Sequence, residues 1–100
     1  MWQPITTAEL DAIVSRQLGA CSPEQQAFFA RYRVPFYAVP IHRLGAVERV
    51  FVVAELASGL LYYEDVEEGF EVSKPGVDGA IAQQGCNQYE LRHVLAQNGL

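Results

Sequence analysis

The run at residues 48–56 constrains the fold most, because it has the pattern of a strand that is apolar on both faces. Side chains along a strand point alternately to the two sides of the sheet. Those on one side are Val50, Val52, Ala54 and Leu56, and those on the other are Phe51 and Val53. A strand of this kind lies centrally in its sheet and needs cover on both faces. Any fold of this chain therefore has to bury both sides of this run.

Further strands are predicted on either side of this run. Residues 36–42 form a strand whose Pro40 has no N–H to donate, which places the strand at the sheet edge. Residues 60–66 return antiparallel after a tight turn, and residues 70–73 alternate as a short strand. A brief fifth strand is expected at residues 79–83. Short turns between consecutive strands indicate an antiparallel sheet.

Helix start signals lie before and after the strands. Thr6 and Glu9 have the spacing of a capping box, in which each side chain accepts a hydrogen bond from the other residue's backbone N–H. Ser22 and Gln25 repeat this spacing, and Asn87 is a favoured N-cap for a C-terminal helix. The element order becomes α-α-β-β-β-β-α. That order predicts an α+β fold with about four antiparallel strands and helices on one face of the sheet.

At 100 residues, half of them hydrophobic, the chain fits one domain, residues 1–100, with its own core. It has no apolar run of the roughly 18–20 residues that a membrane helix needs. Its first residues lack the basic and apolar regions of a signal peptide. We therefore expect a cytoplasmic protein that does not bind membranes. Cys21 and Cys86 are then expected to be reduced thiols rather than a disulfide.

Charge is distributed unevenly along the chain. The net charge is −5, and residues 51–100 hold eight acids against Lys74 and Arg92. Direct binding of nucleic acid needs clustered cations on one surface, which this sequence lacks. An acidic surface instead favours a basic protein partner, or it serves solubility alone.

The acids concentrate in one predicted hairpin. Glu64 and Asp65 adjoin on a strand and should point to opposite faces, so the acids cannot all form one site. Their spacing does not match a calcium-binding EF-hand loop. Three interpretations stay open: a solvated hairpin with Arg49 opposite one acid, a surface for a partner, or a divalent-cation site. Five carboxylates fall within eight residues: Glu64, Asp65, Glu67, Glu68 and Glu71.

Two tyrosines directly precede these acids. Aromatic side chains beside a charged rim are typical of the centre of a protein interface. One tyrosine of the pair could equally belong to the core, because aromatic residues dominate cores. On the first interpretation, the residues that bind the partner are Tyr62, Tyr63, Glu64, Asp65, Glu67 and Glu68.

An alternative site is a pocket between the sheet and the helices, lined by Tyr37, His42, Cys86 and His93. Cys86 would precede a helix N-terminus, a position that makes a thiol more reactive. The histidines and cysteines lack the close spacing of zinc ligands, and no nucleotide or hydrolase motif is present. No metal, no cofactor and no catalytic residue are therefore predicted.

In build and charge the chain resembles small acidic α+β proteins of bacteria, including immunity proteins of toxin systems and products of mobile gene cassettes. The resemblance transfers no functional residue. We expect a non-catalytic binding module of the immunity or inhibitor type, which docks its acidic hairpin on a basic partner. The alternative is a small-molecule-binding or enzymatic domain. A homodimer through the sheet is also expected, because helices would cover only one of the two apolar faces.

Overall fold

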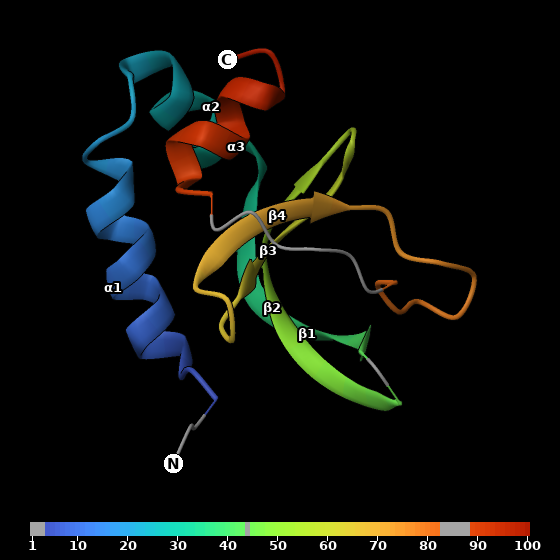
Figure 1. Ribbon diagram of the computed structural model, residues 1–100. Coiled ribbons are helices and arrows are strands. Elements are labelled where there is room, and N and C mark those ends of the chain that lie inside the picture. The colour runs from blue at the N-terminus through green and yellow to red at the C-terminus, as the bar shows by residue number, and fades with distance from the viewer. Residues whose placement is uncertain (1–3, 44, 83–88) are drawn as a thin grey trace.

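The computed structural model describes residues 4–43, 45–82 and 89–100. Within them the predicted α+β fold and element order are confirmed (Figure 1). None of the described helices has the length and apolar character that crossing a membrane would require. The helices are α1 (Thr7–Leu18), α2 (Pro23–Tyr32) and α3 (Leu91–Gln97). The strands are β1 (Arg33–Arg43), β2 (Ala46–Leu56), β3 (Gly59–Glu64) and β4 (Gly69–Ser73).

The sheet is antiparallel throughout, in the order β1-β2-β3-β4. As Pro40 predicts, β1 lies at an edge. The β1–β2 hairpin is longer than the rest of the sheet, because residues 46–50 of β2 pair with β1 and not with β3. We call this extension, residues 39–43 and 46–50, the β1–β2 arm. It reaches beyond the part of the sheet that β3 and β4 complete.

Both predicted capping boxes are present. Thr6 Oγ1 accepts the Glu9 N–H at 3.1 Å, and Glu9 Oε1 accepts the Thr6 N–H at 3.0 Å. Ser22 and Gln25 exchange the corresponding bonds at 3.1 and 2.9 Å. The hydrogen bonds satisfy backbone donors that a helix leaves free at its first turn, so they fix where α1 and α2 begin.

The C-terminal helix begins later than predicted. The expected N-cap, Asn87, lies outside the described residues, and α3 begins at Leu91 with Glu90 as its N-cap. Tyr89 is held extended instead, because its carbonyl accepts the Phe70 N–H at 2.9 Å. The first N–H of α3, from Leu91, donates to Gln17 Oε1 of α1 at 2.7 Å. A contact between distant segments, rather than a local cap, therefore sets this helix start.

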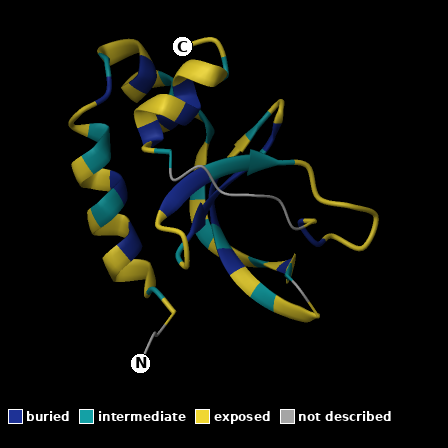
Figure 2. Cartoon of the chain, viewed as in Figure 1, coloured by how far each residue is buried: buried dark blue, intermediate teal, exposed yellow. Residues whose placement is uncertain are grey.

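The sheet buries apolar side chains on both faces, as its central strand requires. Figures 1 and 2 show the three helices gathered over one face, with buried residues in the centre of the sheet and on the inward sides of the helices. The predicted alternation along β2 was wrong beyond Val52. The pairing is irregular between Val52 and Ala54, and this turns Ala54 and Leu56 to the helix side together with Val53. On the other face Val52 packs in a second cluster with Ile41, Val50, Tyr62 and Ile81.

The second face is covered by the chain itself. Residues 74–82, which we call the strap, leave β4 and reach the outer edge of β1 (Figure 1). There the Ile81 N–H donates to the Pro40 carbonyl at 2.8 Å, and the Ile81 carbonyl accepts the His42 N–H at 2.9 Å. The Ile81 side chain is fully buried. The expected fifth strand at residues 79–83 is thus a single bridge within the described residues. The premise of the homodimer, an uncovered second face, was wrong, and self-association stays a prediction.

Replacement of Gly59 by alanine should lower the free energy of unfolding by about 2 kcal/mol or more, measured by urea denaturation. Gly59 has φ of +143°, and an added Cβ would lie 2.8 Å from the backbone of Ser73 in β4. Gly45→Ala is the matched control, because Gly45 also has positive φ, +71°, but no atom within 4 Å of its Cβ position. The control should lose only about 1 kcal/mol of backbone strain. Equal losses would contradict the steric reason.

Candidate functional site

A cleft of about 610 Å³ lies where the N-terminal segment passes beside the β1–β2 arm. Because α1 begins only at Thr7, none of the described helices covers this end of the sheet. Its floor is a row of neighbours across three strands, in which Ala38 pairs with Phe51 and Phe51 with Tyr63. We call it the central cleft. Its lining residues are Pro4, Ile5, Ala38, Glu48, Arg49, Val50, Phe51, Tyr63 and Asp65.

An acidic crevice of about 450 Å³ adjoins the central cleft on the side of α1. The two share Ile5, Tyr63 and Asp65. Carboxylates from the start of α1 and from the turn between β3 and β4 meet above an apolar floor, and no Lys or Arg is among the described residues that line it. The lining residues are Ile5, Glu9, Ala12, Ile13, Tyr63, Asp65 and Glu68.

A third hollow, of about 500 Å³, adjoins the central cleft on the side of the arm. It shares Ala38, Glu48 and Arg49 with the cleft and continues to Val39, Pro40 and Val47. Val47 is 62 % exposed, so it adds apolar surface to this hollow. The three compartments together form what we call the groove, with acids at the α1 end and Arg49 at the arm end.

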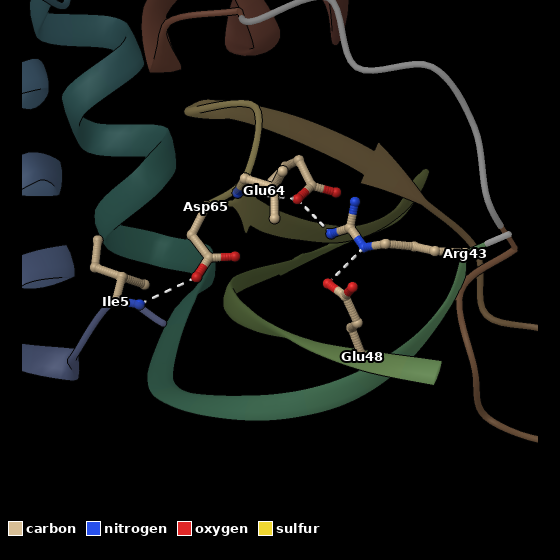
Figure 3. Close-up of polar contacts among 6 residues, drawn as sticks. Ile5, Arg43, Glu48, Glu64 and Asp65 are labelled. Carbon is tan, nitrogen blue, oxygen red and sulfur yellow. Dashed lines mark hydrogen bonds and ion pairs between the residues drawn. The ribbon is translucent and has the colours of Figure 1, made fainter. Parts of the chain in front are cut away.

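Asp65 lines both the acidic crevice and the central cleft and fixes the N-terminal segment between them. Its Oδ2 accepts the backbone N–H of Ile5 at 3.0 Å, across 60 residues of sequence (Figure 3). The other carboxylate oxygen points away from Ile5. The donor to this carboxylate is a neutral backbone N–H, and the charge of Asp65 also helps to raise the pKa of Arg43.

Glu64 points to the opposite face from Asp65, as predicted. Its side chain is buried, with only 4 % of the residue exposed, and it forms an ion pair with Arg43 of β1. Arg43 Nε also lies 3.0 Å from Glu48 Oε2, without hydrogen-bond alignment (Figure 3). Burial by itself would lower the pKa of Arg43, but the hydrogen bond and charge of Glu64, together with Glu48, outweigh it and raise that pKa. The cation that faces the hairpin is therefore Arg43, and not Arg49 as expected.

The structure corrects the predicted exposure of three binding residues. Tyr62 and Tyr63 are 1 % and 5 % exposed, because β3 is a central strand with apolar clusters on both faces. Tyr63 packs edge-on against Phe70, with ring centroids 5.0 Å apart. Glu64 is neutralised inside the domain, as described above. Neither tyrosine is thus an exposed anchor, although Tyr63 contributes to the groove floor.

Three of the six predicted binding residues keep access to solvent. Glu67 and Glu68 are exposed in the turn between β3 and β4, and Asp65 is half-buried beside them. Glu68 has φ of +58°, a left-handed conformation that directs the turn. The turn between β3 and β4 is therefore the part of the predicted hairpin site that faces solvent.

The alternative pocket residues lie in separate places. The Tyr37 hydroxyl donates to Glu55 Oε2 at 2.7 Å on the exposed side of β1 and β2, and His42 Nε2 lies 3.1 Å from Asp78 Oδ2 of the strap. His93 is exposed on α3, and Cys86 lies outside the described residues. Core side chains pack between the sheet and the helices, and Tyr37, His42 and His93 do not converge there. No group of three His, Cys, Asp or Glu in the described ranges could hold a metal ion.

Sequence reasoning missed most of the groove. The apolar character of Phe51 and the charge of Arg49 were visible, but Phe51 was assigned to an apolar face of its strand and Arg49 to one acid of the hairpin. The N-terminal segment gave no signal, because its position depends on the long-range bond from Ile5 to Asp65. Comparison with known proteins found no match to a family model, a curated protein or a solved structure.

Replacement of Arg43 by alanine should reduce the free energy of unfolding by about 3–5 kcal/mol, because it leaves the buried Glu64 carboxylate without a partner. Urea denaturation measures the loss. Arg49→Ala is the control, since Arg49 is an exposed cation of the same hairpin and should cost no more than about 0.5 kcal/mol. Adding Glu64→Gln to Arg43→Ala should recover part of the loss. If the double variant is no more stable than Arg43→Ala alone, the broken ion pair is not the cause of the lost stability.

Tyr37 should titrate well above an ordinary tyrosine. Burial, the hydrogen bond to Glu55 and the charge of that carboxylate together raise its pKa from 10.0 to about 12. A pKa raised on folding adds stability that is complete below pH 10 and is lost as the pH rises through 12. Phenolate absorbance measures the titration. Glu55→Gln should move one tyrosine to lower pH, and an unchanged titration would exclude Glu55 as a cause.

Proposed function

We propose that this chain is a non-catalytic protein-binding module that docks a basic partner in the groove, with the turn at Asp65–Glu68 and Glu9 as its acidic rim. The observation that carries the proposal is the acidic crevice, where carboxylates from segments far apart in sequence surround an apolar floor without a lining cation. Opposite charges on two proteins speed their encounter and fix their relative orientation. An apolar floor inside a charged rim supplies the part of an interface that carries most of the affinity.

The acids that line the groove support binding rather than proton transfer. Glu48 is engaged by Arg43, and one oxygen of Asp65 is engaged by the Ile5 N–H. Glu9 is engaged by its capping box, which lowers its pKa and keeps it charged. The fixed negative charge of Glu9 suits recognition of a cation. The partner class is a protein with a cationic surface, such as a toxin or a nucleic-acid-binding protein whose cationic site the module occludes.

We place the module, as an inhibitor of the immunity type, in the cytoplasm, where Cys21 would stay a reduced, buried thiol. A small-molecule-binding domain is the second candidate. The volume of the central cleft, about 610 Å³, favours it because small-molecule sites commonly have this size. That site would differ from the pocket predicted from the sequence, because the central cleft is not lined by Tyr37, His42 or His93. Saturable binding of a small molecule that displaces the basic partner would support it.

Reversing the charge of Glu67 and Glu68 to lysine should weaken binding of a lysine-rich peptide by about tenfold and flatten its salt dependence. NMR titration of the wild-type protein should shift the amide signals of Glu9, Asp65 and Glu68. The matched control reverses two exposed acids elsewhere, Glu24 on α2 and Glu90 before α3, with the same change in net charge. If this control weakens binding equally, net charge alone attracts the peptide and the proposed site is wrong.

A further inference from the structure

We infer that the central cleft receives one large apolar side chain of the basic partner, and that the opposite charges at the two ends of the groove fix the orientation of the partner's segment. This inference rests on the proposed function and names the kind of segment that the groove selects. It concerns a motif with three parts: basic residues, an apolar anchor and a carboxylate.

The anchor follows from the floor of the central cleft. Ala38, Phe51 and Tyr63 form one row across β1, β2 and β3. The first residue of the row has only a methyl side chain, so the row leaves a hollow beside Phe51 that Ile5 closes from the other side. Phe51 is accordingly only half-buried, although it lies in a central strand. An aromatic or large aliphatic side chain of a partner would fill this hollow and complete the burial of Phe51.

The orientation follows from the charges. Glu9, Asp65 and Glu68 line one end of the groove. At the other end Arg49 lies beside Glu48, whose carboxylate is already paired with Arg43. In the described part of the chain, no acid lies within ion-pairing distance of Arg49. A segment with its cations over the crevice and a carboxylate at Arg49 satisfies both ends, whereas the reverse placement opposes like charges.

The occupant is a segment of a different protein rather than a second copy of this chain. The net charge of −5 makes two copies repel each other. In a symmetric pair that brings crevice against crevice, carboxylates would face carboxylates with no lining cation between them. A basic protein with an exposed loop that carries an apolar residue meets all three requirements of the groove.

Selection from a random dodecapeptide library displayed on phage tests this inference on the whole protein. The expected consensus has basic residues, one large apolar residue and an acid on the far side of it. Ala38→Trp, which fills the hollow, should weaken binding of the selected peptide by roughly tenfold or more. Ala30→Trp on the exposed side of α2 is the matched control and should leave the affinity unchanged. Arg49→Glu should weaken binding, and replacing the peptide's acid by lysine should restore it.

The outcomes separate the two proposals. A consensus of basic residues without an apolar anchor, or an affinity that Ala38→Trp does not change, overturns the inference and leaves the proposed function standing. Failure of the charge exchange at Arg49 overturns the orientation and with it the inferred motif. A library that yields no peptide, or one without basic residues, overturns the proposed function together with the inference.

Discussion

The fold depends on the need to cover β2 on both faces. On one face the three helices cover it, and on the other the strap does, with Ile81 fully buried against Val50, Val52 and Tyr62. The two outer edges of the sheet are also partly paired. The strap forms a bridge to β1, and Tyr89, just before α3, forms a bridge to β4. Exposed strand edges invite pairing with other chains, so these two contacts limit the surfaces open to association.

The groove is a consequence of how far the helical cover extends. The capping box at Thr6 stops α1 before it reaches the β1–β2 arm, and only the residues ahead of the helix pass beside it. The apolar row that ends at Ala38 therefore stays partly open on the helix side. The groove arises here because α1 begins before the long β1–β2 hairpin is covered, and no special motif marks it in the sequence.

The acidic hairpin shows how alternation along a strand divides one charge cluster into two roles. Glu64 turns inward, where Arg43 neutralises it, and Asp65 turns to the helix side, where it binds the Ile5 N–H. Only the turn that follows faces solvent freely. A buried ion pair of this kind is costly to break because it leaves one charge unpaired. Glu64 therefore belongs to the framework of the hairpin, whereas Asp65, Glu67 and Glu68 keep access to solvent.

The sequence by itself determined the features that depend on neighbouring residues: the two capping boxes, the edge position of Pro40, the antiparallel order and the opposite directions of Glu64 and Asp65. Only the tertiary structure decided what is exposed and what meets across long separations. The burial of Tyr62 and Tyr63, the choice of Arg43 over Arg49 and the delayed start of α3 are of this second kind. The physical reason is that caps and alternation act over a few residues, whereas cover, ion pairing and the groove need segments whose approach no local pattern encodes.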